Sequence, residues 1–359
     1  VHYPLGRWTN HNIRLPSQMA GKSKGGSQMN IRTMFASAIA ASTIALSAGT
    51  ADAREMSLAT YIPASSSFVQ SLVEPWAKWI TDNANGEFTV KVYAGGTLGR
   101  DPNQQDRLVS SGVADMAAIV PGRNLGAYPH YAMFELPGFA RSADEGSYAA
   151  WQMHKDGTLK TGENLKILTV WTTDPYTVHT SAPVKSIDDI KGKQLRVLGQ
   201  TQTASVLALG GVPQAVKITE TPEAISRGTL DGSLADWAVF DVFKIGEVVE
   251  HSYQLPMGVL AMSIAMNPNS FEELSPEGQA VLTEAGEVWQ QMVVDYYGSE
   301  RGRITSKYTE GGLTITEPDD AAMQTLLDAT SDLAVKARES VGDAVMDAYV
   351  ARLEEHRAK

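Results

Sequence analysis

The chain has 359 residues, of which 41 are acidic and 30 are lysine or arginine, so its formal net charge at pH 7 is −11. An acidic surface disfavours binding to nucleic acid and to anionic membranes, since both attract basic proteins. The chain contains no cysteine, which excludes disulfides, thiolate nucleophiles and thiolate metal sites. We therefore expect a protein that depends on its core for stability and tolerates an oxidising compartment.

The beginning of the chain carries the pattern of a secretory signal peptide. A basic start precedes an alanine-rich apolar run over residues 35–48, and residues 51–53 (Ala-Asp-Ala) match a cleavage site. The run of 14 residues is shorter than the ~20 that a membrane span needs. We predict a signal peptide over residues 29–53, cleavage after Ala53, a periplasmic location and no later membrane insertion. Residues 1–28 match no targeting pattern, and we interpret them as a mis-called or extraneous extension.

Strands and helices are predicted to alternate along the rest of the chain. An apolar strand over residues 56–61 is followed by a helix over residues 68–83, in which apolar residues recur every four positions. Strands alternate with helices, and some of the strands are apolar throughout. This pattern indicates an α/β fold with buried sheets. Similar patterns predict further strands over residues 88–93, 116–120, 167–171, 195–197 and 259–266, and further helices over residues 103–111, 203–209, 276–309 and 321–352.

Two features indicate interleaved lobes rather than two separate domains. No Pro- or Ser-rich linker divides the chain, and the strand over residues 259–266 is expected to return it from the second lobe to the first. At ~1.5 Å per residue, the helix over residues 276–309 would extend ~45–50 Å, enough to lie across both lobes. We predict hinge strands between lobe I, made of residues 54–178 and 261–308, and lobe II, made of residues 179–260 and 309–359.

Seven short motifs become specific through their order and spacing. They are Ala-Gly-Gly-Thr-Leu-Gly at 94–99, Ser-Gly-Val-Ala-Asp at 111–115, Glu-Leu-Pro-Gly-Phe at 135–139, Asp-Asp-Ile-Lys-Gly-Lys-Gln-Leu-Arg-Val at 188–197, Ala-Leu-Gly-Gly-Val-Pro at 208–213, Gly-Thr-Leu-Asp-Gly at 228–232 and Asn-Pro-Asn-Ser-Phe-Glu-Glu-Leu-Ser-Pro-Glu at 267–277. Together they resemble the solute-binding proteins of TRAP-type (tripartite ATP-independent periplasmic) transporters, over about residues 55–345. The resemblance implies two α/β lobes with crossover strands and a helix spanning both. It also implies that hinge closure captures an organic acid, a small-molecule carboxylate ligand, for delivery to membrane permease subunits.

Arg196 is the strongest candidate for a ligand contact. Side chains alternate along a strand, so Arg196 points away from the face that Leu195 and Val197 share. Its planar guanidinium can donate two parallel hydrogen bonds to one carboxylate, whereas the alternative is a salt bridge on an exposed strand face. The resemblance places the family's carboxylate-binding arginine at Arg196.

Aromatic residues near predicted strand ends are candidates for the walls of the site. Ligands of α/β sheets usually bind where strands end, and core packing is the alternative for each of these residues. The candidates are Tyr61, Phe134, Trp171, Trp237 and Phe240.

Three polar residues complete the predicted site. Arg123 follows the predicted strand over residues 116–120 and would give a second anion contact, with a surface loop arginine as the alternative. Asp236 lies where the resemblance implies a polar ligand contact, and an acid there suits a hydroxyl or ammonium group. Gln200, just after the Arg196 strand, would donate an amide hydrogen bond.

Two departures from the family pattern bear on the ligand. Members that bind sialic acid carry a further arginine before the turn at residues 186–189, where this chain has His-Thr-Ser-Ala-Pro at residues 179–183. They also carry Glu-Asn where this chain has Leu and Ala at residues 234–235. Both differences disfavour sialic acid and favour a smaller or more apolar acid against Trp171 and Trp237.

The predicted mature chain carries no recognised catalytic motif. It lacks a Gly-x-Ser-x-Gly elbow, a His-Glu-x-x-His pair, a phosphate loop and a Gly-x-Gly-x-x-Gly loop. Its histidines are not spaced as metal ligands, so we expect no metal, no cofactor and no catalytic residue. The alternatives are a secreted α/β hydrolase or lyase, and a ligand-sensing subunit that passes its signal to a receptor.

Overall fold

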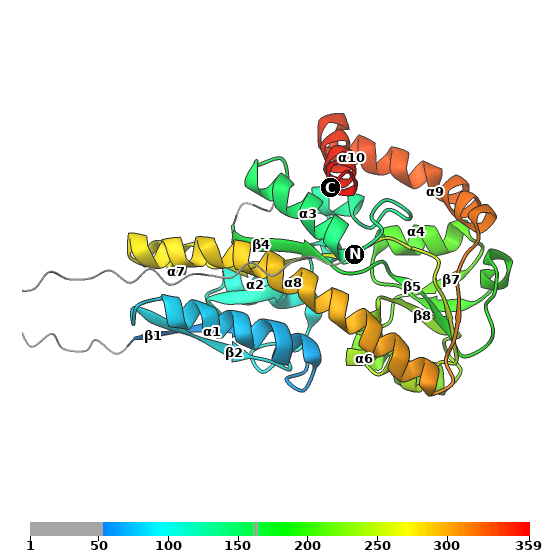
Figure 1. The fold of residues 1–359 in the computed structure, drawn as a ribbon, viewed down its shortest axis with the longest axis horizontal. Coiled ribbons are helices and arrows are strands. Elements are labelled where there is room, and N and C mark those ends of the chain that lie inside the picture. Colours follow the sequence, from blue (N-terminus) through cyan, green and yellow to red (C-terminus); the bar gives the residue numbers. More distant parts are fainter. Residues whose placement is uncertain (1–52, 161, 163) are drawn as a thin grey trace, which may run out of the picture. The chain divides into compact units, whose positions relative to one another are not determined.

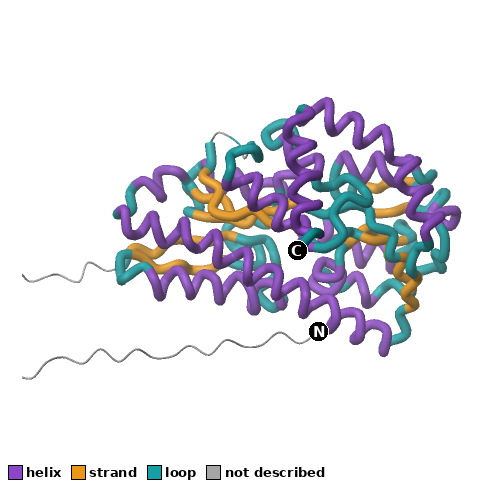
Figure 2. Tube along the Cα trace, turned by 45° about the horizontal axis from the view of Figure 1, so that its top comes forward, coloured by secondary structure: helices purple, strands orange, loops and turns teal. Residues whose placement is uncertain are grey.

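Two β-sheets organise the computed structural model, which describes residues 53–160, 162 and 164–359 (Figure 1). Figure 2 shows their strands in two groups with helices around them. The first sheet contains β2 (Phe88–Tyr93), β1 (Arg54–Ala59), β3 (Met116–Ile119), β10 (Ala261–Met266) and β4 (Lys166–Thr172), in this order. The second contains β11 (Thr314–Thr316), β9 (His251–Tyr253), β5 (Thr177–Thr180), β8 (Gly232–Ala235), β6 (Gln194–Arg196) and β7 (Val212–Gln214), in this order.

The first sheet combines parallel and antiparallel pairs. Strand β1 is parallel to β2 and β3, whereas β10 runs antiparallel between β3 and β4. Both β3 and β10 are buried along their whole length, as their continuous apolar sequences predict. The helices that pack around this sheet are α1 (Glu74–Asn83), α2 (Gln105–Ser110) and α3 (Ala143–Lys155), with the short turns η1 (Val69–Val73), η2 (Pro102–Gln104), η3 (Pro121–Arg123) and η4 (Pro129–Met133).

The second sheet is built from shorter strands. Strand β5 runs antiparallel to β8 and β9, while β6 is parallel to β7 and β8. This parallel pairing places Arg196 beside Gln214 on one side and Ser233 on the other. Its helical segments are α4 (Gln200–Ala208), α5 (Thr221–Ser226) and α6 (Trp237–Val242), with η5 (Ile187–Ile190), η6 (Ile218–Glu220) and η7 (Ile245–Glu247).

Besides the long segment between β10 and β11, two short crossover segments join the sheets, one between β4 and β5 and one between β9 and β10. They are hydrogen-bonded to each other: the Thr173 amide donates to the Leu260 carbonyl at 2.9 Å, and the Tyr176 amide donates to the Gly258 carbonyl at 2.8 Å. The Met257 amide donates back to the Tyr176 carbonyl at 2.8 Å. The chain therefore passes between the sheets through a narrow paired ribbon, as the predicted hinge strands require.

Helix α8 (Pro276–Glu310) extends along both sheets, following the short α7 (Pro268–Glu272) (Figure 1). At ~1.5 Å per residue, its 35 residues measure about 50 Å. It packs against α1 and β4 of the first sheet and against α6 of the second. On the first side, the Trp289 ring lies 5.2 Å from Trp76 and 4.6 Å from Trp171. The predicted spanning helix is thus present.

The last two helices, α9 (Asp320–Val341) and α10 (Asp343–Arg357), replace the single helical stretch that the sequence predicts. Gly342 separates them with a backbone φ of 90°, a conformation that favours glycine. Helix α10 turns back onto α3, and its Tyr349 ring lies 5.0 Å from Phe134 of the first sheet's core. The expected grouping of residues 343–357 with lobe II does not agree with these contacts; the other lobe boundaries stay a prediction.

The predicted extension and signal peptide lie outside the described residues, apart from Ala53. Across the part of the chain that is described, no helix combines the length and the apolarity needed to cross a lipid bilayer.

Candidate ligand-binding site

A cavity of about 40 Å³ lies where the two sheets, the crossover ribbon and α8 meet. Its lining is mostly apolar and aromatic, and it includes two arginines. Among the described residues, no aspartate or glutamate lines it. Such a cavity suits an anion with an apolar body. The lining residues are Tyr61, Ile62, Phe68, Arg123, Thr173, Tyr176, Arg196, Leu198, Ile218, Ala238, Val239, Val242, Phe243, Leu260, Met262 and Tyr297.

Arg196 enters the cavity from the last position of β6. Its side chain is 1% exposed, and its Nε donates to the Val216 carbonyl at 3.2 Å. Its Nη1 is buried without a hydrogen-bond partner among the described residues. The pKa of Arg196 is lowered to about 10, chiefly by burial, and the nearby positive charge of Arg123 contributes in the same direction. The guanidinium thus stays charged at neutral pH while part of its donor capacity is unused.

Arg123 reaches the same cavity from the opposite side, from η3 after strand β3. Its Nη1 donates to Asn103 Oδ1 at 2.7 Å, and its Nε is buried with no partner in the described part of the chain. Each sheet therefore contributes one guanidinium. An anion between them would be attracted by both charges, in surroundings where screening by water is weak.

Tyrosine hydroxyls supply the remaining polar groups of the lining. Burial raises the pKa of Tyr176 and of Tyr297 well above the usual value. Burial also raises the pKa of Tyr61, although Arg123 and Arg196 act in the opposite direction. All three phenols are consequently neutral at physiological pH and can donate a hydrogen bond. The Tyr61 ring also stacks on Phe243 at 6.5 Å, which closes one wall.

Asp236 lies next to the cavity without lining it. Its Oδ1 caps α6 by accepting a hydrogen bond from the Val239 amide at 3.0 Å, while Oδ2 is buried and unpartnered within the described residues. Burial raises the pKa of Asp236 to about 7. The helix cap is a sufficient reason for an acidic residue directly after β8, so a ligand contact is not needed to explain Asp236.

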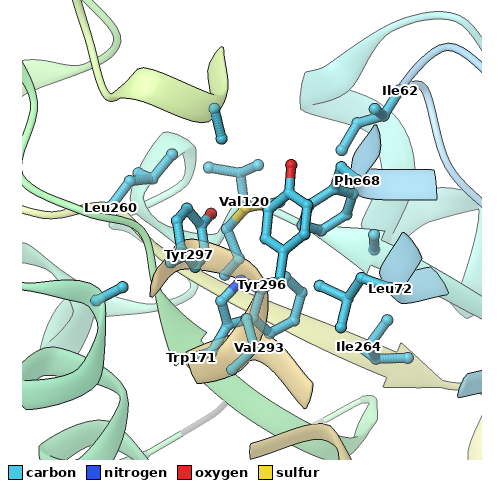
Figure 3. Close-up of a cluster of buried hydrophobic side chains, with 14 of the residues drawn as sticks. Ile62, Phe68, Leu72, Val120, Trp171, Leu260, Ile264, Val293, Tyr296 and Tyr297 are labelled. Atoms are coloured by element: carbon cyan, nitrogen blue, oxygen red, sulfur yellow. The ribbon is translucent and has the colours of Figure 1, made fainter. Parts of the chain in front are cut away.

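Of the nine residues proposed from the sequence, the cavity brings together Arg196, Arg123 and Tyr61. Trp171 is fully buried, with its ring 6.4 Å from Phe68, and Figure 3 shows it among core side chains next to Val293. It therefore lies behind the lining, in the position that the core-packing alternative describes. Its side chain points toward α8, where Trp289 covers it.

The remaining proposed residues also lie away from the cavity. The rings of Trp237 and Phe240 pack on buried His179, at 5.3 and 4.5 Å. The Phe134 ring is enclosed between Tyr131 and Tyr349 in the first sheet's core. Gln200 is exposed at the start of α4. Any role of these residues in binding stays a prediction that the geometry does not favour.

Four aromatic lining residues are absent from the sequence-based proposal, which favoured strand ends. Tyr176 lies in the crossover ribbon and Tyr297 in the middle of α8, while Phe68 and Phe243 lie near the ends of helices. The one signal that could have indicated these four residues is that ligand pockets are often lined by aromatic side chains. Within the described residues, no three His, Cys, Asp or Glu side chains are grouped to hold a metal ion. The two arginines of the lining suit the cavity to binding an anion.

Comparison with known proteins agrees with this geometry. Residues 44–337 match the family model of the bacterial extracellular solute-binding proteins, family 7. A solute-binding protein of Sulfitobacter sp. is 24% identical over 244 residues, which cover 66% of this chain and 74% of that protein. The uncharacterized protein YiiZ of Salmonella typhimurium is 26% identical over 214 residues, which cover 57% of this chain and 64% of YiiZ.

Solved structures share the fold. A marine metagenome TRAP solute-binding protein specific for aromatic acid ligands, in complex with metahydroxyphenylacetate, superposes with a TM-score of 0.77 at 22% identity, covering 84% of this chain and 99% of that one. A TRAP solute-binding protein of Rhodoferax ferrireducens with copurified benzoate gives 0.77 at 20% identity, covering 85% and 98%. One from Desulfovibrio salexigens, an open complex, gives 0.74 at 25% identity, covering 85% and 95%. The predicted two-lobed α/β fold is confirmed.

Proposed function

Because the chain belongs to family 7 of the bacterial extracellular solute-binding proteins, we propose that it captures an organic acid around Arg196 and delivers it to a TRAP-type membrane transporter. The family assignment confirms the resemblance drawn from the motifs. It is an assignment to binding proteins of transport systems, so it supports the binding function over the secreted hydrolase or lyase. In this proposal the protein works in the periplasm and returns its ligand chemically unchanged.

The observation that carries the proposal is the buried, incompletely bonded guanidinium of Arg196. A buried charged donor without a partner is costly, and a ligand carboxylate would satisfy it with two parallel hydrogen bonds. The second guanidinium, Arg123, adds attraction from the other sheet. The hydroxyls of Tyr176 and Tyr297 would donate to the remaining carboxylate lone pairs.

Hinge closure explains how an acid would reach a site whose lining residues are mostly buried. The cavity of about 40 Å³ is smaller than the engineered cavity of about 150 Å³ that holds benzene in another protein. A ring-sized ligand therefore requires the two sheets to move apart. The paired crossover ribbon connects the two sheets, and small backbone changes there would rotate one sheet relative to the other.

The lining favours a monocarboxylate with an apolar body. Beyond the arginines and tyrosines, the walls are aliphatic or aromatic, for example Ile218, Leu260 and Met262. A micromolar site requires about −8 kcal/mol, of which a charge-assisted hydrogen bond supplies roughly 1.5–3 kcal/mol. Burial of the apolar body must contribute much of the rest. The aromatic acids held by the marine metagenome and Rhodoferax proteins fit this class.

A thermal-shift screen tests the proposal. The predicted mature chain would be heated with benzoate, mandelate, pyroglutamate, glucuronate and short dicarboxylates in separate wells. We expect a subset of monocarboxylates to raise the melting temperature, and recovery of that acid unchanged by chromatography. No stabilisation by any carboxylate would contradict the binding function, and consumption of the acid would instead support the enzyme alternative.

A further inference from the structure

Glu135 is a buried carboxylic acid that the cavity does not use. Its side chain is 1% exposed, and neither carboxyl oxygen has a hydrogen-bond partner in the described part of the chain. Most buried polar groups are hydrogen-bonded, so a group with two unpartnered oxygens requires an explanation. An ionised carboxylate in such surroundings is strongly disfavoured, whereas the protonated acid is tolerated.

Three glycines from three parts of the fold pack closely on Glu135, two of them against its carboxyl group. A Cβ atom on Gly122 of η3 would overlap Glu135 Oε1, and a Cβ on Gly258 of the crossover ribbon would overlap the Glu135 backbone. A Cβ on Gly199, which precedes α4, would lie 3.8 Å from Glu135 Oε2 and 3.5 Å from the Gly122 carbonyl oxygen. The carboxyl group thus lies at the seam where a loop of the second sheet closes onto a loop of the first.

The seam offers Glu135 little electrostatic compensation. Arg123 is the charged group near it, and it acts to lower the pKa of Glu135, but burial dominates and raises that pKa to about 8. His130 of η4 is turned away, since its Nδ1 accepts a hydrogen bond from the Lys160 amide at 3.1 Å. Neither α4 nor the crossover residues 256–260 carry an ionisable side chain. In the closed arrangement Glu135 is therefore best accommodated as the neutral acid.

We infer that closure of the two sheets around the ligand takes up one proton from solvent, and that Glu135 is the group that binds it. The inference rests on the proposed function, because it requires sheets that separate. When Gly199 and α4 move away with the second sheet, water reaches the carboxyl group and it ionises. When they return, water is excluded and the carboxylate accepts a proton. Ligand capture is consequently stronger at lower pH.

Isothermal titration calorimetry tests this linkage, with benzoate and pyroglutamate as probes. Both acids are ionised throughout the range from pH 5.5 to 7.5. Where one proton is taken up on binding, linkage requires the Kd to rise about tenfold for each pH unit. Titrations in two buffers of different ionisation enthalpy count the protons directly. We expect Glu135→Gln, which imitates the neutral acid, to take up about one proton fewer than the wild type and to lose that tenfold dependence.

A matched variant and the wild type itself make the test decisive. Glu74→Gln, in the exposed first turn of α1, should keep the wild-type proton count. Asp236 and Asp174 are further buried acids near the site, so an undiminished count in Glu135→Gln would assign the proton elsewhere and overturn the inference. If Glu135→Gln does not fold, an equal wild-type Kd at pH 5.5 and 7.5 would overturn it. Binding that is independent of pH leaves the proposed function intact, whereas no binding of any acid at any pH would overturn the proposed function as well.

Discussion

The Asp174 carboxylate in the crossover ribbon is paired with the Arg301 guanidinium of α8, with Nη2 at 2.8 Å from Oδ1 and Nε at 3.0 Å from Oδ2. Oδ1 also accepts a hydrogen bond from the Ala143 amide, at the start of α3, at 3.0 Å. One buried carboxylate therefore joins the ribbon, α3 and α8 at a single point. The hinge between the sheets is anchored there by charge rather than by apolar packing alone.

We predict that Arg301→Met lowers the free energy of unfolding by about 1–3 kcal/mol, because it leaves the buried Asp174 carboxylate without its charged partner. Methionine keeps much of the apolar stem of arginine, so the loss reports the charge and the hydrogen bonds. Denaturant unfolding would measure it. The control is Arg227→Met on α5, whose ion pair with Glu223 is exposed and should matter by less than about 0.5 kcal/mol. Equal effects of the two substitutions would contradict the anchoring role.

Arg196→Ala should abolish ligand-induced thermal stabilisation while the circular dichroism spectrum stays unchanged. Loss of the charge-assisted hydrogen bonds, roughly 1.5–3 kcal/mol, corresponds to a Kd about 10- to 150-fold higher. Arg196→Lys should not restore binding, because an ammonium group cannot donate two parallel bonds from a planar fork. Arg227→Ala serves as the surface control. Stabilisation like that of the wild type in Arg196→Ala would count against the site.

Trp171→Ala should act on stability more than on selectivity. The sequence alone suggests a wall residue, whose loss would weaken apolar acids more than short polar ones. The structure places the ring between Phe68 and Trp289 in the core, so we expect the free energy of unfolding to fall by about 3–5 kcal/mol. Titrations with one apolar acid and one short polar acid should then show similar losses of affinity. A loss of affinity for apolar acids alone would instead support Trp171 as a residue that lines the site.

His179 should make the fold sensitive to mild acid. Burial lowers the pKa of His179 to about 4, below its value of about 6.5 in an unfolded chain. The unfolded state therefore binds more protons between these values, so the contribution of His179 is complete above about pH 6.5 and is lost as the pH falls toward 4. Between these two pKa values, His179 makes the free energy of unfolding change by about 1.4 kcal/mol per pH unit. We expect His179→Gln to flatten the dependence of unfolding free energy on pH in this range, and an unchanged slope would contradict the assignment.

Local patterns predicted the long elements well. The apolar runs at β3 and β10 and the helical spacing of α8 lie within a few residues of the observed bounds, because burial on both faces and a 3.6-residue period both leave marks in the sequence. Four strands of the second sheet have only three residues each, and the sequence patterns did not predict three of them, β7, β9 and β11. Segments so short carry no readable period, and their pairing depends on partners far away in the chain.

What the amino-acid order determined by itself was the family and the alternation of strands and helices. It also indicated Arg196 as the candidate for binding an acid, since this arginine stands alone between apolar residues in a short strand. Which aromatic rings line the cavity was decided only by the tertiary structure. Tyr176, Phe243 and Tyr297 come from a crossover, a helix end and the middle of α8, and they meet because folding brings distant segments to one seam. Trp171 has the local sequence pattern expected of a residue that lines the site, but α8 packs against it and it lies in the core.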